Sequence, residues 1–158
     1  MSNRRVARER VMQALYAHEL AGGDVRHFIE TNLKPELEDP ENLAFAESLF
    51  LRTLDFGDEA DAVVRQHLQH WDLGRVALID RILLRMAICE FVGFEDIPPK
   101  VTINEVIEIA KKYSTPKSGQ FINGILDAVL LELQQQGRLK KSGRGLIGME
   151  TVAGRGAQ

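Results

Sequence analysis

The chain has 158 residues, 44% of them hydrophobic and 27% charged, with a formal net charge of −3 at pH 7. It is long enough to bury a core as one domain, no stretch approaches the roughly 18 consecutive apolar residues of a membrane span, and the basic start is not followed by the apolar block of a signal peptide. We therefore expect a soluble, cytoplasmic, helical domain, and the single cysteine, Cys89, excludes an internal disulfide and a cysteine-rich metal site.

The first predicted helix, residues 4–21, concentrates positive charge. The stretch "NRRVARER" contains four arginines, within the first ten residues of a chain whose net charge is negative. This concentration of positive charge indicates that the N-terminal end binds an anionic partner. At about 100° per residue, one side of this helix is predicted to be buried and the other to face solvent. The buried side comprises Ala7, Val11, Ala14, Leu15 and His18, and the solvent-facing side comprises Arg5, Arg8, Met12 and Tyr16, with Arg4 at its start.

The solvent-facing side has the chemistry of a surface for single-stranded RNA. Guanidinium groups bind phosphate in a bidentate manner, and an exposed tyrosine beside them offers a face on which a base stacks. The alternative interpretation is a charged helix face that is simply solvated.

Four further helices are predicted before the last third of the chain. Each follows an aspartate suited to cap its first turn: Asp24, Asp39, Asp58 and Asp72. Gly57 is predicted to separate the second and third of these helices. Their expected ranges are 25–34, 40–56, 59–70 and 74–94. Between residues 30 and 61, ten acidic residues against two basic ones predict a surface that repels nucleic acid.

No group of side chains in the sequence predicts catalysis or a bound metal. His67 and His70 have a spacing that suits a metal, but no third ligand or supporting cysteine accompanies them. No nucleophile, base and orienting group form a recognisable set. We therefore expect no enzyme activity, no cofactor and no metal site.

Two helices are predicted in the last third. Thr102 and Glu105 have the spacing of a capping box, with Val101 and Val106 as a hydrophobic staple, which predicts a helix over 103–113. The next helix is predicted over 116–136, where Thr115 caps and Pro116 takes the first position. Because strand-like alternation is absent, the predicted fold is all-α, a bundle of about seven helices.

Phe121 points away from the apolar stripe of this last helix. It shares its ridge with Lys117, and Gln120 lies beside it, so it is a second candidate for stacking an RNA base. The alternative is that Phe121 packs on a neighbouring helix that approaches closely at Gly119 and Gly124.

The segment 137–158 is rich in glycine and basic residues and is predicted to be a flexible tail after a single domain over 1–136. Its "GRGLIG" matches a dinucleotide-binding pattern. Because that pattern has meaning only between a strand and a helix, we interpret the match as accidental.

Three stretches resemble the NusB family of transcription antitermination factors, over roughly residues 3–134. They are "RRVARERVMQALYAHEL" (4–20), "DRILLRMAICE" (80–90) and "IPPKVTINEVIEIAKKYSTPKSGQFINGILDAV" (97–129). The resemblance implies two packed helical subdomains and no catalysis. It also implies binding of single-stranded boxA RNA together with the ribosomal small-subunit protein NusE, so that RNA polymerase in the elongation complex reads through terminators, especially in ribosomal RNA operons.

The resemblance also implies which residues face the RNA. The matching positions are Arg4, Arg5, Arg8 and Tyr16 in the first stretch and Lys117, Ser118, Gln120 and Phe121 in the last. Asp80 matches an acidic position near the RNA and partner surface. Family members often have an acidic residue where this chain has Lys117, so we expect stronger binding that does not depend on RNA sequence.

Two other functions are compatible with the sequence. The protein could be a helical protein–protein scaffold whose basic helix is covered in a homodimer, since some family members are dimers. Similar helical domains also precede some ribosomal RNA methyltransferases, but this chain has no room for a catalytic domain.

Overall fold

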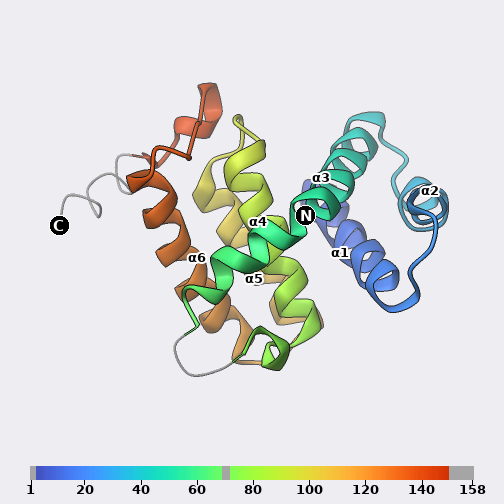
Figure 1. The fold of residues 1–158 in the computed structure, drawn as a ribbon. Helices are drawn as coiled ribbons and strands as arrows, with labels where there is room; N and C mark the ends of the chain where they lie inside the picture. Colours follow the sequence, from blue (N-terminus) through green and yellow to red (C-terminus); the bar gives the residue numbers. More distant parts are fainter. Residues whose placement is uncertain (1–2, 69–71, 150–158) are drawn as a thin grey trace.

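The computed structural model describes residues 3–68 and 72–149, which contain six α-helices and no strand (Figure 1). The all-α prediction is confirmed, although the number of helices differs by one. The helices are α1 (Asn3–Ala21), α2 (Val25–Phe28), α3 (Pro40–Arg65), α4 (Leu78–Gly93), α5 (Pro99–Tyr113) and α6 (Ser118–Gln135). None of these helices has the length and apolar character needed to cross a membrane.

The predicted break at Gly57 is wrong, because α3 runs through it without interruption. Glycine inside a helix costs about 1 kcal/mol relative to alanine. The buried stripe of α3 offsets this cost, since it continues at helical spacing on both sides of the glycine through Phe50, Thr53, Ala60 and Val64. Packing against the neighbouring helices therefore decides the length of α3, rather than local propensity.

Two of the four predicted aspartate caps are confirmed, at Asp24 and Asp39, whereas Asp58 lies inside α3 and Asp72 makes no side-chain cap bond. The Asp24 carboxylate accepts from the backbone N–H of Arg26 at 3.0 Å, and Asp39 accepts from that of Asn42 at 3.0 Å. The predicted starts of α4, α5 and α6 are wrong by two to four residues. In particular, α5 begins at Pro99, so Thr102 lies inside the helix rather than at its cap.

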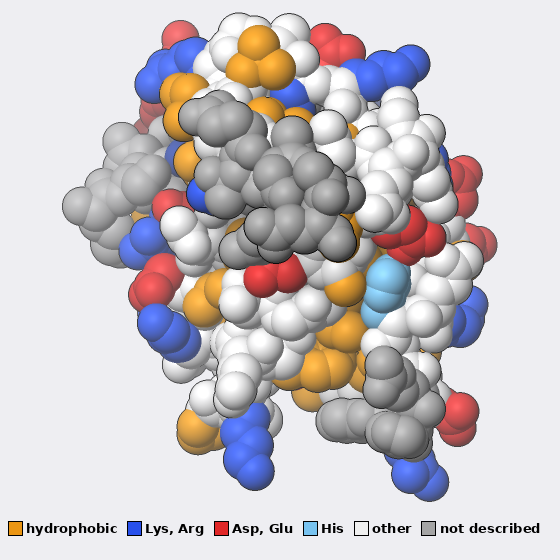
Figure 2. Space-filling model, turned by 90° about the vertical axis from the view of Figure 1, so that its left-hand side faces the viewer, with side chains coloured by type: hydrophobic (Ala, Val, Ile, Leu, Met, Phe, Trp, Pro, Cys, Tyr) orange, Lys and Arg blue, Asp and Glu red, His pale blue; other side chains and the backbone are white. Residues whose placement is uncertain are grey.

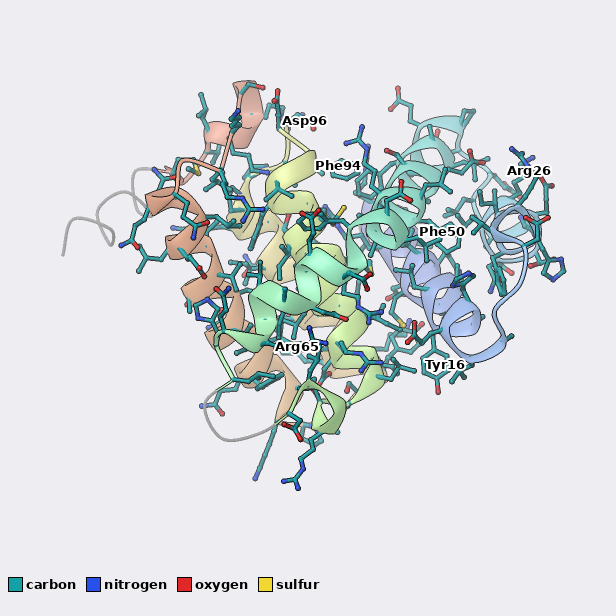
Figure 3. The ribbon with its side chains drawn as sticks, viewed as in Figure 1. Tyr16, Arg26, Phe50, Arg65, Phe94 and Asp96 are labelled. Atoms are coloured by element: carbon teal, nitrogen blue, oxygen red, sulfur yellow. The ribbon has the colours of Figure 1, made fainter. Side chains whose placement is uncertain are left out.

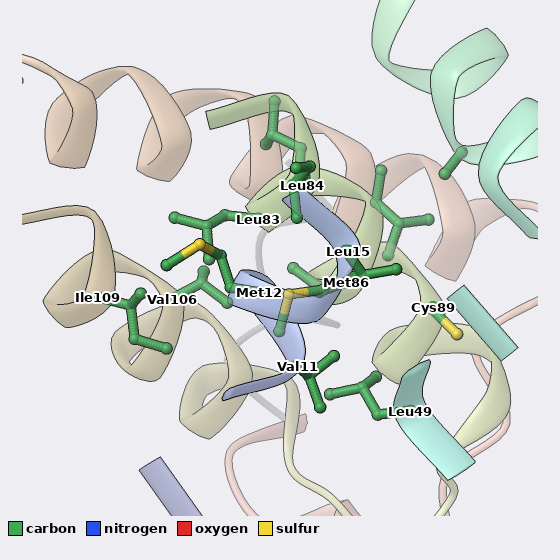
Figure 4. Packing of buried hydrophobic residues seen from close by; sticks show 14 of the residues in the cluster. Val11, Met12, Leu15, Leu49, Leu83, Leu84, Met86, Cys89, Val106 and Ile109 are labelled. Carbon is green, nitrogen blue, oxygen red and sulfur yellow. The ribbon is translucent and has the colours of Figure 1, made fainter. Parts of the chain in front are cut away.

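One hydrophobic core connects the helices. Figure 1 shows α1 and α2 on one side, α4, α5 and α6 on the other, and α3 reaching from the first group across the second. The close view in Figure 4 shows residues of α1, α3, α4 and α5 packed around a common centre: Val11, Met12, Leu15, Leu49, Leu83, Leu84, Met86, Val106 and Ile109. Cys89 belongs to this core, and burial raises the pKa of its thiol to about 11.

Residues 138–149 lie against the end of α4, which differs from the flexible tail expected there. Lys141 Nζ donates to the carbonyl oxygens of Glu90 at 3.0 Å and Phe94 at 2.8 Å, at the negative end of the helix dipole. Gly145 touches the backbone of Glu95 so closely that an added Cβ would lie 1.9 Å from the Glu95 oxygen. Residues 150–158 of the expected tail lie outside the described residues.

Candidate nucleic-acid interface

The side of α1 that faces α5 carries alternating polar contacts. Arg5 donates from Nε and Nη2 to the Glu105 carboxylate at 2.5 and 3.2 Å. One turn along α1, Glu9 accepts from Lys112 Nζ and from the Tyr113 hydroxyl, both at 3.3 Å. These bonds attach α1 along the length of α5. We call this row of residues, together with Gln13 and Tyr16, the α1–α5 border.

Tyr16 lies at the outer end of the α1–α5 border. Gln13, one turn before it, donates from Nε2 to the Tyr113 hydroxyl at 3.4 Å. The Tyr16 side chain is 37% exposed, and Figure 3 shows it at the edge of the molecule. An aromatic face is therefore available to solvent beside a row of charged and amide groups.

The prediction that Arg8 and Met12 face solvent is wrong. Arg8 is 2% exposed and lies in the interior, where Nε and Nη2 each donate to the Glu90 carboxylate at 2.8 Å. Thr102 Oγ1 donates to the same carboxylate at 2.8 Å. Burial is the largest single influence and lowers the pKa of Arg8, but the hydrogen bonds and charge of Glu90 raise it above its ordinary value. Arg8 is therefore a buried structural cation, and Met12 belongs to the core.

One sequence signal could have revealed the buried pair. Glu90 interrupts the apolar run "RMAICEF" of α4, and a charge in such a run needs a buried partner. A helical wheel of α1 alone assigns one buried face. In the structure α1 contacts α3, α4 and α5, so most of its circumference is covered.

Arg4 points toward the beginning of α3. Its guanidinium lies 4.2 Å from the centre of the Phe45 ring, a cation–π geometry. The three arginines expected on one ridge therefore do not face solvent together. Arg4 lies over Phe45, Arg5 bonds to Glu105, and Arg8 lies in the core with its guanidinium 5.2 Å from the same Phe45 ring.

Asp80 and Ser118 meet at the start of α6. The Asp80 carboxylate accepts from Ser114 Oγ at 2.7 Å and from Ser118 Oγ at 2.8 Å. Both Asp80 and Ser118 are buried. Ser118 therefore does not lie on the surface, where a residue that faces RNA was expected. Their bonds instead hold the turn between α5 and α6 in place.

An open pocket of about 270 Å³ lies beside this turn. Phe121 and Val76 line it, and Arg75 and Lys117 contribute positive charge. Phe121 is half-buried and packs partly against the core, while Lys117 and Gln120 are exposed. The close helix approach predicted at Gly119 is present, since an added Cβ there would lie 3.4 Å from Ile107, but Gly124 has open space around it.

The C-terminal end of α5 connects the two predicted RNA stretches. Tyr113 bonds to Glu9 and Gln13 of α1, and the next residue, Ser114, bonds to Asp80 beside the pocket. The α1–α5 border and the Phe121 pocket are therefore linked by adjacent residues of one turn. By contrast, the face on the α6 side shown in Figure 2 has acidic and basic side chains interspersed, without a large patch of one sign.

Of the two histidines considered as metal ligands, the structure describes only His67. His67 Nε2 lies 2.6 Å from Glu132 Oε2, and this contact joins the end of α3 to α6. His70 lies outside the described residues. Within residues 3–68 and 72–149, no group of three histidine, cysteine or acidic side chains is arranged to hold an ion.

Comparisons with known proteins give one consistent family. A model described as the NusB family matches residues 5–131. The transcription antitermination protein NusB of Salinibacter ruber is 53% identical over 153 residues, covering 96% of each chain. The protein of the same name from Bacillus mycoides is 44% identical over 127 residues, covering 80% of this chain and 95% of its own.

Solved structures agree on the fold. T. maritima NusB superposes with a TM-score of 0.74 at 35% identity, covering 82% of this chain and 91% of the other. A structure of antitermination factors NusB and NusE in complex with dsRNA has a TM-score of 0.73, covering 82% of this chain and 96% of the other. At 23% identity, that second likeness shows the fold alone.

Proposed function

This chain belongs to the NusB family, and we propose that it binds single-stranded boxA RNA together with the ribosomal protein NusE. In this role it joins RNA polymerase in the elongation complex, in the cytoplasm, and promotes read-through of terminators in ribosomal RNA operons. We assign it no catalytic step. The relatives named for antitermination support the proposal, as does the similar fold seen in a complex of NusB and NusE with dsRNA.

The observation that carries the proposal is the link between the α1–α5 border, where Tyr16 is exposed, and the Phe121 pocket through the end of α5. In our account Tyr16 and Phe121 stack unpaired bases, while Arg5, Lys117 and Gln120 contact the phosphates. Arg4, which lies over Phe45, adds a further positive charge at the start of α1.

Three residues of the predicted set receive different roles from their positions. Arg8 does not reach the RNA, and it holds α1 against α4 through Glu90. Ser118 and Asp80 likewise act from below the surface, because their bonds fix the turn that presents Lys117 and Phe121.

The test is RNA affinity in variants of the two aromatic residues. Tyr16→Ala and Phe121→Leu should each weaken binding of a boxA oligomer by about 1 to 3 kcal/mol, because stacking of one base contributes this much. Phe121→Leu keeps an apolar side chain in place of the ring. Leu51→Ala, at another exposed apolar residue, is the matched control. Wild-type affinity in both aromatic variants, with unchanged thermal melting, would contradict the proposal.

A further inference from the structure

The cations of the α1–α5 border are paired with carboxylates of the same chain. Arg5 is held by Glu105, and Lys112 is held by Glu9. Any RNA phosphate that approaches either cation can use its remaining N–H groups, but it also meets a negative group already bonded to that cation.

In both pairs the anion is much less exposed than the cation. Lys112 is 57% exposed against 7% for Glu9, and Arg5 is 33% exposed against 14% for Glu105. Glu9 is further fixed by the Tyr113 hydroxyl. The carboxylates therefore cannot turn away into solvent, whereas the long lysine and arginine side chains reach outward from them.

The carboxylates act on the cations electrostatically. The hydrogen bond that Arg5 donates to Glu105 is the main cause that raises the pKa of Arg5. For Lys112, the hydrogen bonds to Tyr113 and then to Glu9 raise the pKa. Each cation is thus stabilised in its charged form by a partner that competes for the same donor hydrogens.

We propose that Glu105 and Glu9 are internal competitors of RNA phosphate that lower the affinity of the α1–α5 border for RNA. This inference rests on the proposed function. A phosphate at Arg5 or Lys112 must share the cation with a fixed carboxylate or displace it, so charge alone gives weak binding. Stable binding then depends on bases that stack on Tyr16 and Phe121. RNA whose bases do not stack there dissociates.

The exposed pair of Lys111 and Glu108 illustrates the difference. Glu108 is 44% exposed and lies one turn from its lysine on the same helix, so water and salt compete freely for it. We assign no competing role to Glu108.

The experiment measures binding of oligouridine and of boxA RNA to Glu105→Gln, Glu9→Gln and the double variant at several salt concentrations. Each single change should tighten oligouridine binding about two- to fivefold at low salt, the range of one exposed charge interaction. Each should also steepen the log-affinity against log-salt slope for oligouridine by up to roughly 0.7, the contribution of one more phosphate contact on a single strand. Glu59→Gln, an equal charge change on the exposed surface of α3, should have a smaller effect.

A second variant identifies the cation through which the gain arises. Adding Arg5→Gln to Glu105→Gln should abolish the tighter binding, because the released guanidinium is then missing. Thermal melting shows whether each variant is folded, and Glu9→Gln tests the same idea if Glu105→Gln is not. Weaker or unchanged oligouridine binding in folded variants would overturn the inference. If the wild type still binds boxA RNA in that case, the proposed function stands. A wild-type protein without affinity for boxA RNA would overturn both.

Discussion

Arg5 and Arg8 lie three residues apart on α1 and make the same kind of bond, a bidentate pair with a glutamate, in two different regions of the molecule. The Arg8–Glu90 pair is enclosed, with both side chains at most 2% exposed, while Arg5 at the border is 33% exposed. Identical chemistry therefore has opposite consequences. The enclosed pair fixes the helices, and the border pair leaves its cation partly open to solvent.

The largest effect is expected where the enclosed pair is broken. Arg8→Met leaves Glu90 charged and buried with Thr102 as its remaining side-chain donor, and removal of one partner of such a pair costs about 3 to 5 kcal/mol. Urea unfolding should show this loss in the free energy of unfolding.

Removal of the second charge is the control for the enclosed pair. Arg8→Met combined with Glu90→Met should recover much of the loss, since no unpaired charge remains. If Arg8→Met alone costs less than about 1 kcal/mol, in the range of a surface pair, the contrast between the two regions does not hold.

The next largest loss of stability is expected at Asp80, a buried acidic residue bonded to two serine hydroxyls. Asp80→Ala removes the acceptor of Ser114 and Ser118, and unsatisfied buried donors cost about 1 to 3 kcal/mol. Asp58→Ala, an exposed aspartate of α3, should stay within about 0.5 kcal/mol. Equal melting temperatures for the two variants would show that the Asp80 network does not stabilise the turn.

Lys141 is an intermediate case, half-buried at the end of α4. Burial lowers its pKa to about 8, against an ordinary value of 10.5. Between these values the unfolded chain keeps the proton that the folded protein has released, so stability rises with pH. By this linkage, the free energy of unfolding of the wild type, measured relative to Lys141→Met, should increase by roughly 1 to 2 kcal/mol from pH 8 to pH 10. Lys140→Met, at the exposed neighbouring lysine, should leave the pH dependence of the wild type in place.

The smallest effect on stability is expected at the border. Arg5→Gln should cost about 0.2 to 1 kcal/mol in urea unfolding, because the pair is partly exposed. The same change should make the salt dependence of boxA binding shallower by about 0.7. Arg26→Gln on α2 is the matched control, and an equal slope change there would mean that the effect reflects net charge alone.

Local patterns in the sequence predicted the helices well and their partners poorly. The caps at Asp24 and Asp39 were found because a cap involves neighbours in the chain. The apparent capping box of Thr102 and Glu105 failed because both side chains bind distant residues, Glu90 and Arg5. A pattern of spacing cannot distinguish a local partner from one that lies 12 or 100 residues away in the chain.

The candidate site was predicted in part for the same reason. Tyr16, Lys117 and Gln120 are exposed as expected, and their RNA contacts remain predictions. Arg8 and Ser118 carry the same sequence signal but face the interior. Their burial depends on how α1, α4, α5 and α6 pack together, which the periodicity of a single helix does not contain.

The central claim is that the α1–α5 border and the Phe121 pocket bind one strand of unpaired RNA at the same time. Photocrosslinking with boxA RNA that contains 4-thiouridine, followed by mass spectrometry of the crosslinked peptides, tests this most directly. Crosslinks are expected at Tyr16 and at Phe121, and both should be lost when an excess of unmodified boxA RNA is added. Crosslinks confined to the acidic surface of α3, or to one of the two aromatic residues alone, would contradict it.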